Sequence, residues 1–297
     1  MPMLSGPLAA ALAYILWGLF PIYIKQIEHI PALEIVLHRS AWSLVFMAGL
    51  LLVLRRLAWL RSALRQPRTL ALFGISALLL GCNWLLYVWA VNSGRVLDAS
   101  LGYFINPLIN VMLGYAVLHE RPRPLQWAAV ALAAAGVLWL TISAGGLPWV
   151  SLMLAMSFGA YGLLRKTATL GAIEGLALET LLLAPLAVGG LLWLMASGEG
   201  HFARGSWSDS LWLMAAGPVT AIPLLLFASG ARRVSMATLG LLQYLGPSIQ
   251  FLLGVFVYHE HFSASRGVGF VLIWAALVIY SAESWRKLRQ QRLAAVG

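Results

Sequence analysis

The sequence predicts an all-α polytopic membrane protein with ten transmembrane helices in two inverted five-helix repeats. Three observations lead to this fold class. Hydrophobic residues make up 61% of the chain and charged residues only 10%, whereas soluble domains are about one quarter charged. Ten apolar segments of spanning length can be drawn along the chain. One stretch also occurs twice, and internal repeats indicate a duplicated architecture.

The ten apolar segments follow one another with short connections, and each is close to the roughly 20 residues that a spanning helix needs. They are residues 7–24, 33–54, 70–92, 97–118, 124–142, 148–165, 174–195, 210–230, 235–258 and 265–283. The widest connection, around residues 197–209, contains Gly, Ser and charged residues, as expected of a loop.

The repeated stretch reads LDASLGYFINPLINVMLGYAVLHE from residue 97 and MATLGLLQYLGPSIQFLLGVFVYHE from residue 236. Matching residues lie 138 positions apart at the start and 140 apart from Pro107 and Pro247 onward. Because each half holds five segments, an odd number, the second half must cross the membrane upside down. The predicted units are residues 1–143, the inverted copy 144–285, and a basic cytoplasmic tail, 286–297.

Lys and Arg residues set the expected orientation. With the N-terminus in the cytoplasm, the opposite side carries only Lys25, Arg95, Arg204 and Arg266 of the 20 Lys and Arg residues. Arg39 lies inside a segment, and all the others fall in cytoplasmic loops or in the tail. The positive-inside rule therefore predicts a multi-pass inner-membrane protein with both termini in the cytoplasm.

Composition also limits the partners. The formal net charge of +10 comes without a nucleic-acid-binding motif, and the sequence contains no P-loop, dinucleotide fingerprint or HExxH motif. Cys82 is the single cysteine, so the chain has neither an intrachain disulfide nor a cysteine cluster for zinc. We expect the lipid bilayer and a small-molecule substrate as partners, with no cofactor, no metal and no nucleic acid. The sequence leaves the oligomeric state open.

Ionisable residues inside membrane segments are costly, and they are functional candidates by default. His38 and Arg39 lie one to two turns inside the second segment, and Glu34, His38 and Trp42 share one helix face. At an offset of 141, Glu179 and Thr180 occupy the corresponding place in the seventh segment.

These two positions allow two interpretations. A symmetric site could hold a zwitterion, with Arg39 on its carboxylate and Glu179 on its amine. Alternatively, Arg39 and Glu179 pair with each other or with the backbone and hold the bundle together. Arg39 could also extend towards the outer interface. Glu179 or His38 is a candidate proton carrier, because a carboxyl group removed from water favours its neutral form.

The repeated stretch places polar residues beside its proline in both copies. Tyr103 and Asn106 precede Pro107 on one helix face, and Gln243 and Tyr244 precede Pro247. Proline frees a carbonyl and bends the helix, which is tolerated where the backbone lines a cavity. The alternative role of these amides is hydrogen bonding between helices. Cavity lining is the prediction.

Further candidates are polar or aromatic residues near the segment centres: Asn83, Trp84 and Tyr87 in the third segment, Trp42 in the second and Tyr161 in the sixth. His119–Glu120 and His259–Glu260 occur at segment ends, where adjacent residues point about 100° apart. We therefore expect cap or loop roles for these two pairs and no metal or catalytic site.

The stretches HRSAWSLVF, GCNWLLYVWAVNSGRVLDASLGYFINPLINVMLGYAVLHER and LGLLQYLGPSIQFLL resemble the RarD branch of the EamA family, within the drug/metabolite transporter superfamily. The resemblance covers nearly the whole chain. It implies an inner-membrane permease with ten helices in two inverted halves around a central cavity. Proteins of this branch carry a chloramphenicol-sensitivity label, and related branches export amino acids and other small metabolites. The resemblance implies no particular coupling ion.

The predicted function is secondary transport, in the export direction, of small metabolites such as amino acids or amphipathic drugs, by alternating access around a central cavity. Protons are a candidate coupling ion. The alternatives are a membrane sensor or scaffold that does not transport, and an intramembrane enzyme acting on a lipid-linked substrate; no catalytic residues are predicted. The predicted substrate-binding residues are His38, Arg39, Trp42, Asn83, Trp84, Tyr87, Tyr103, Asn106, Tyr161, Glu179, Gln243 and Tyr244.

Overall fold

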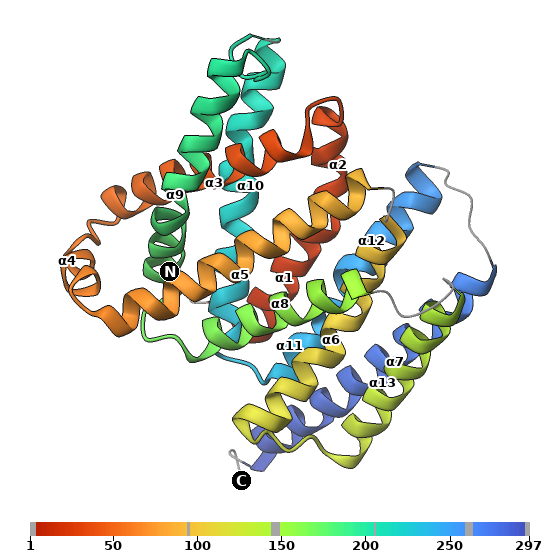
Figure 1. The fold of residues 1–297 in the computed structure, drawn as a ribbon. Helices are drawn as coiled ribbons and strands as arrows, with labels where there is room; N and C mark the ends of the chain where they lie inside the picture. The colour runs from red at the N-terminus through yellow and green to blue at the C-terminus, as the bar shows by residue number, and fades with distance from the viewer. Residues whose placement is uncertain (1–3, 94–95, 144–148, 205, 259–263, 295–297) are drawn as a thin grey trace.

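A computed structural model describes residues 4–93, 96–143, 149–204, 206–258 and 264–294, and these residues contain helices and no strand (Figure 1). The helices of the first half are α1 (Gly6–Gly18), α2 (Phe20–Ile24), η1 (Lys25–Ile27), α3 (Ala32–Val53), α4 (Ala58–Leu64), α5 (Pro67–Asn92), α6 (Val96–Leu118) and α7 (Pro124–Ser143). Those of the second half are α8 (Trp149–Thr167), α9 (Ala172–Ser197), α10 (Trp207–Ala231), α11 (Met236–Gln243), α12 (Leu245–Leu252), η2 (Leu253–Val257) and α13 (Ala264–Ala294).

The helices confirm an all-α polytopic membrane protein. Within the described residues, seven helical stretches are long and apolar enough to cross a membrane. They are Gly6–Ile27, Ala32–Val53, Pro67–Tyr87, Pro124–Ser143, Ala172–Ser197, Trp207–Ala231 and Met236–Val257. The remaining predicted segments correspond to α6, α8 and α13, so the count of ten crossings stays a prediction.

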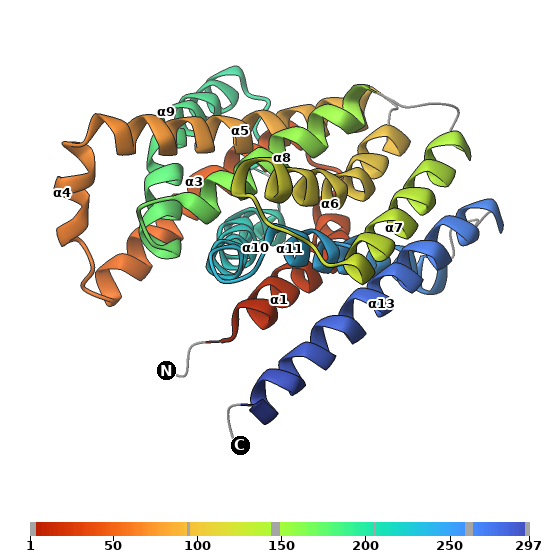
Figure 2. The ribbon, with the colours of Figure 1, turned by 90° about the horizontal axis from the view of Figure 1, so that it is seen from below.

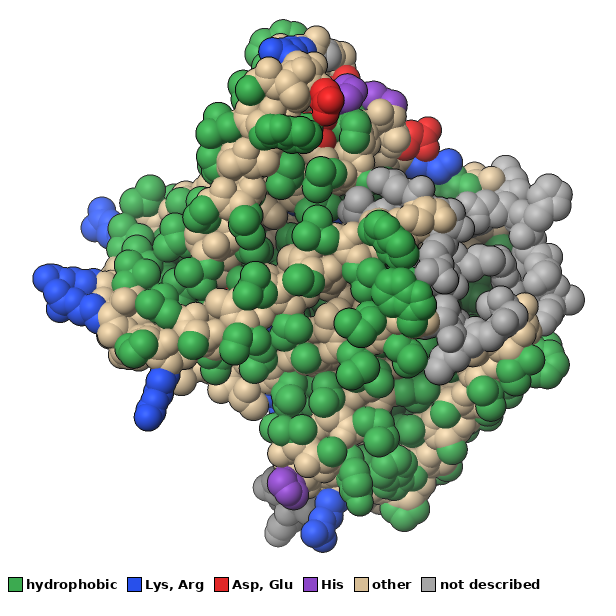
Figure 3. Space-filling model, in the orientation of Figure 1, with side chains coloured by type: hydrophobic (Ala, Val, Ile, Leu, Met, Phe, Trp, Pro, Cys, Tyr) green, Lys and Arg blue, Asp and Glu red, His purple; other side chains and the backbone are tan. Residues whose placement is uncertain are grey.

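Side chains on the surface agree with a lipid environment. In Figure 3, hydrophobic side chains are spread over the whole visible face, and the Lys and Arg side chains that can be seen lie mainly at its edges. Val45, Leu186 and Phe256 are among the large apolar side chains that are more than half exposed. A soluble monomer rarely exposes such extended apolar surface, whereas a bilayer covers it.

Helices from the two halves pack mainly against each other. α1 packs on α10 and α12, α3 on α9 and α10, α5 on α8 and α9, α6 on α8 and α11, and α7 on α13. The α7–α13 pair runs side by side in both views (Figures 1 and 2). Each helix of the first half has a counterpart in the second half: α1 with α8, α3 with α9, α5 with α10, α6 with α11 and α12, and α7 with α13. Replacing every helix by its counterpart gives the same list of packed pairs.

Prolines break two of the predicted segments. Pro21 has no N–H and its ring crowds the preceding turn, so α1 ends at Gly18 and α2 begins at Phe20. The carbonyl of Trp17, four residues before the proline, accepts a hydrogen bond from the side chain of Gln250 at 3.1 Å. Pro247 similarly separates α11 from α12, whereas α6 continues through Pro107.

Two segments outside the predicted spans are helical. The segment between α3 and α5 was predicted as a loop, but it contains the short helix α4. The basic tail continues α13 as a helix to Ala294, because residues 284–294 contain no Gly or Pro and are rich in good helix formers.

Glycines allow close helix contacts between the halves. A Cβ at Gly217 of α10 would lie 2.4 Å from the backbone oxygen of Trp42 in α3, and one at Gly240 of α11 would lie 2.6 Å from the backbone oxygen of Pro107 in α6. Backbone atoms cannot move aside as flexible side chains do. The α3–α10 and α6–α11 contacts therefore require glycine at these two positions.

We expect Gly217→Ala to lower the thermal unfolding temperature of the purified protein, because the added methyl group forces α3 and α10 apart at a cost of about 1–3 kcal/mol. Gly189→Ala is the matched control, since a Cβ at Gly189 meets no atom within 4 Å. Equal unfolding temperatures for both variants would show that the α3–α10 contact tolerates separation.

Candidate functional site

Arg39 lies among aromatic residues from several helices of the bundle. Its guanidinium carbon stands 4.6 Å from the ring centroid of Trp84 in α5 and 4.9 Å from that of Phe20 in α2. Its Nε donates a hydrogen bond to Oγ1 of Thr220 in α10 at 3.0 Å. Cation–π contacts of this kind stabilise a positive charge where water is scarce.

Three tyrosines complete the surroundings of Arg39. Tyr23, Tyr87 and Tyr103 stand close enough to interact with its charge. The rings of Tyr87 and Tyr103 meet edge to face, with centroids 5.9 Å apart, and both side chains keep more than a third of their surface open. The Tyr23 hydroxyl is held by the backbone oxygen of Trp212 at 2.8 Å.

The guanidinium of Arg39 has free hydrogen-bonding capacity. Within the described residues, its terminal nitrogens Nη1 and Nη2 make no hydrogen bond, Arg39 has no carboxylate partner, and neither nitrogen is sealed from solvent. An arginine presents a planar fork of donors that matches a carboxylate or phosphate. Arg39 can therefore bind an anionic group while the surrounding rings contact apolar parts of the same molecule.

Helix distortions shape this site. Phe20 and Tyr23 lie just after the break that Pro21 produces between α1 and α2. Thr220 lies in α10 between Pro218 and Pro223, and prolines inside a helix interrupt its hydrogen bonding. Irregular backbone at membrane depth is tolerated where it lines a cavity or is buried in protein.

Glu179 belongs to a second, fully buried cluster. Its carboxylate accepts hydrogen bonds from Ser76 Oγ and, at 3.5 Å, from the Tyr161 hydroxyl, and its Oε1 lies 3.6 Å from Nη1 of Arg165. Arg165 is 1% exposed and donates to the backbone oxygen of Ala172. Arg165 was expected in a cytoplasmic loop, so its burial in the last turn of α8 is a correction.

The two predicted charges therefore have separate partners. The alternative that Arg39 and Glu179 pair with each other is wrong in this conformation, because Glu179 pairs with Arg165. Both charges contact α5: Arg39 lies against Trp84, and Glu179 accepts a hydrogen bond from Ser76. These two residues are eight positions apart, which is about 12 Å along the helix. An α-amino acid carries its amine and carboxylate on one carbon, so it would not reach both side chains at once here.

His38 and Trp42 line a different pocket. It has a volume of about 200 Å³ and lies between α3, the end of α9 and Phe202. Glu34 also lines it and accepts hydrogen bonds from the backbone N–H groups of His201 and Phe202, which holds the α9–α10 loop against α3. Although His38 and Arg39 are adjacent, the helix turns them towards different sites.

The predicted amides are committed to contacts between helices. Asn83 donates to Leu154 and Ser157 of α8, and Asn106 donates to the backbone oxygen of Ala155. Asn110 joins Asn106 to Gln243 across the α6–α11 contact. Their part in substrate binding stays a prediction, and the hydrogen bonds agree with the alternative role that the sequence left open.

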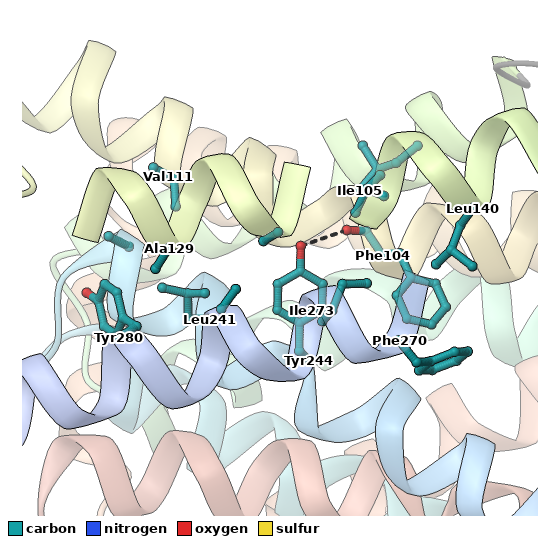
Figure 4. Close-up of a cluster of buried hydrophobic side chains, with 14 of the residues drawn as sticks. Phe104, Ile105, Val111, Ala129, Leu140, Leu241, Tyr244, Phe270, Ile273 and Tyr280 are labelled. Atoms are coloured by element: carbon teal, nitrogen blue, oxygen red, sulfur yellow. Dashed lines mark hydrogen bonds between the residues drawn. The ribbon is translucent and has the colours of Figure 1, made fainter. Parts of the chain in front are cut away.

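Tyr244 also serves the contact between α6 and α11. Its hydroxyl donates to the backbone oxygen of Phe104 at 3.2 Å, and its ring lies in the apolar core formed by α6, α7, α11 and α13 (Figure 4). The figure shows this hydrogen bond as the polar link within a cluster that includes Leu241, Phe270 and Ile273. Tyr244 thus fixes the register of the two repeated helices.

Glu120 has a structural role near the end of α6. Its carboxylate accepts from the backbone N–H of Met236 at the start of α11, and Lys166 lies 3.8 Å away. His259 and Glu260 lie outside the described residues. Within the described part of the chain, no three His, Cys, Asp or Glu side chains gather as metal ligands.

The sequence did not single out Phe20, Tyr23, Thr220, Ser76 or Arg165. Two features of the sequence could have drawn attention to some of them. Phe20 and Tyr23 flank Pro21, and Thr220 lies between two prolines of one apolar segment. Arg165 ends an apolar segment, where a cation is equally compatible with the interface and with burial.

Comparison with known proteins places the chain in a family. Residues 4–142 match the EamA-like transporter family. An uncharacterized transporter of Pseudomonas aeruginosa is 50% identical over 94% of this chain and 93% of its own length. The chain belongs to the EamA family. The RarD protein of Escherichia coli K12 is 44% identical over 93% of each chain, so the match is to RarD-type permeases of this family.

A solved crystal structure shares the same fold. The alignment covers 95% of this chain and 98% of the other, with a TM-score of 0.71 and 22% sequence identity. At this identity the likeness concerns the fold alone. The family and its named relatives identify the chain as a multi-pass membrane transporter.

Removing either partner of the Arg165–Glu179 pair should destabilise the protein strongly. Arg165→Met leaves the Glu179 carboxylate buried with only the Ser76 and Tyr161 hydroxyls, and breaking a buried pair costs about 3–5 kcal/mol. The double variant Arg165→Met/Glu179→Leu should recover much of that loss. A double-mutant cycle of thermal unfolding in detergent measures the coupling, and additive effects would contradict it.

Proposed function

We propose that the chain is a secondary transporter that exports small amphipathic metabolites carrying a carboxylate, by alternating access around Arg39. The single observation that carries this proposal is an arginine inside the bundle whose terminal donors have no protein acceptor among the described residues. A buried arginine of this kind is unfavourable in a membrane protein unless a ligand or water accepts its remaining hydrogen bonds.

The surroundings of Arg39 favour an amphipathic substrate. Phe20 and Trp84 contact the guanidinium itself, and Tyr87 and Tyr103 add aromatic surface that is still open. The carboxylate of such a substrate would accept hydrogen bonds from the terminal nitrogens of Arg39, and its apolar side chain would lie against the rings. Hydrophobic or aromatic amino acids have this combination. Export is the direction that the resemblance to amino-acid exporters implies.

The proposal includes an inverted pair of repeats, residues 1–143 and 144–285. It is supported by the neighbour set, which maps onto itself when the halves are exchanged. It is also supported by Arg39 and Glu179, which lie two turns inside the starts of α3 and α9, the matching helices of the halves. Rocking of one half against the other would then open the site to each side in turn.

We also propose an inner-membrane location with both termini in the cytoplasm. The distribution of Lys and Arg supports this orientation. In that orientation Arg39 lies towards the outer side and the Glu179 cluster towards the inner side. Counterflow of labelled amino acids in proteoliposomes separates a carrier from a sensor, a scaffold or an enzyme, because only a carrier shows exchange stimulated from the opposite side.

Arg39→Gln should weaken the binding of carboxylate substrates by roughly 10- to 100-fold, because it removes a charge-assisted hydrogen-bonded contact. The measurement is competition in counterflow between a labelled hydrophobic amino acid and its unlabelled carboxamide. The wild type should prefer the carboxylate, and the variant should lose that preference. Arg61→Gln, on the exposed face of α4, is the matched control. Retained preference in Arg39→Gln would refute the proposal.

Glu179 is the proposed proton carrier, because protonation would release it from Arg165 and allow the cluster to rearrange. Glu179→Gln should abolish flux driven by a pH gradient. Counterflow by the same preparation should stay measurable, which shows that the variant is folded despite the loss of stability expected from breaking the pair with Arg165. Glu174→Gln is the control, since Glu174 begins the same helix and pairs with the exposed Arg56 at 3.4 Å. Full gradient-driven flux in Glu179→Gln would rule out this role.

A further inference from the structure

A second, larger pocket lies away from Arg39. It has a volume of about 720 Å³ and is built from helix ends. Its walls come from the start of α1, the α6–α7 and α10–α11 connections, α11, and α13 between Leu277 and Trp285. The ribbon in Figure 2 shows the course of α1, α11 and α13. Because the ends of spanning segments lie at the membrane surface, the pocket sits at the level of lipid headgroups.

The charged rim of this pocket is basic. Arg121, Arg123 and Arg233 line it together with one acidic residue, Glu120. Glu120 is already engaged by the Met236 N–H and lies near Lys166.

Arg123 forms an ion pair with Glu283. Arg233 donates only to neutral oxygens, those of Leu4 and Ser229. Arg121 has no hydrogen bond or ion pair in the described part of the chain and is exposed. Two positive charges of the rim therefore lack a carboxylate partner.

The pocket is divided between this rim and an apolar floor. Ala237, Leu241, Leu242 and Leu277 form the floor, and Gln126, Ser235 and Thr238 add neutral polar groups. Trp285 stands at the edge with 73% of its surface exposed. Tryptophan at such a depth is typical of the membrane–water interface, where its ring sits among headgroups.

We propose that this pocket binds the headgroup of an anionic phospholipid. The phosphate would lie against Arg121 and Arg233, and the first carbons of the acyl chains would lie on Leu241 and Leu277. A bilayer supplies this ligand at high local concentration, and basic pockets between spanning helices recognise such headgroups. Most of the floor belongs to α11, which ends at Gln243 and is followed directly by Tyr244. An occupied pocket would therefore brace the contact between the repeated helices.

The proposal does not depend on the substrate or on the direction of transport. None of the pocket residues contacts Arg39, and the residues around Arg39 lie on other turns. A soluble anion is the competing occupant, but it has no apolar part that could contact the apolar floor. The acyl chains are therefore what distinguishes the two occupants experimentally.

The test is native mass spectrometry of the full chain with phosphatidylglycerol and phosphatidylcholine of identical acyl chains. The wild type should retain phosphatidylglycerol preferentially. Arg121→Gln should reduce that preference about fivefold, the amount that one basic side chain near an anionic surface contributes, and Arg121→Glu should reduce it further. Arg61→Gln is the matched control, because Arg61 is also exposed but lies on α4, outside the pocket. Arg121 itself makes no contact that its loss could unfold.

Free glycerol phosphate provides the second arm. If it displaces phosphatidylglycerol at equal concentration, the site recognises a soluble anion and the lipid assignment is overturned. Equal retention of the two lipids by the wild type, or an unchanged preference in both Arg121 variants, would overturn it as well. Selective retention that falls in the Arg121 variants and persists in Arg61→Gln supports it.

Discussion

Every polar group inside the bundle must find its partner within the protein, because hydrocarbon offers none. Two clusters of buried side chains illustrate this constraint. Asn106, Asn110 and Gln243 bond to one another and to α8, and Glu179 is enclosed by Ser76, Tyr161 and Arg165. These links fasten helices of one half to helices of the other. Polar groups that would be unfavourable if they were buried alone therefore hold the two halves together.

Arg39 departs from this pattern, and the proposed substrate site rests on this difference. Its charge is supported by aromatic faces and one threonine hydroxyl, which leaves its terminal donors unused. Aromatic rings stabilise the cation without neutralising it, so attraction for an anion remains. A protein carboxylate beside Arg39, like the Glu179 carboxylate beside Arg165, would have occupied the donors that an anionic ligand needs. Arg39 and Arg165 thus differ in their surroundings: Arg39 keeps unused donors, whereas Arg165 is paired with a carboxylate inside the bundle.

Several features could be read from particular residues before the structure. Low charge and long apolar runs require a membrane protein, and the depth of Arg39 and Glu179 marks them as exceptional. The break at Pro21 lies within a segment that was predicted as continuous, and the missing N–H of proline explains it only in retrospect. Other features had no local signal. Arg165 looks like a loop cation in the sequence, and only the approach of α5 and α9 shows that it is buried.

The sequence by itself determined the membrane class, the family and the residues that are expensive to bury, because these depend on composition and local pattern. Only the tertiary structure decided which of those residues share a site. His38 and Arg39 are neighbours in sequence but face different pockets, since one residue along a helix turns a side chain by about 100°. Arg39 and Glu179, expected at one symmetric site, have different partners because their helices begin at different ends of the bundle. Partner choice depends on packing between distant helices, which no short stretch of sequence encodes.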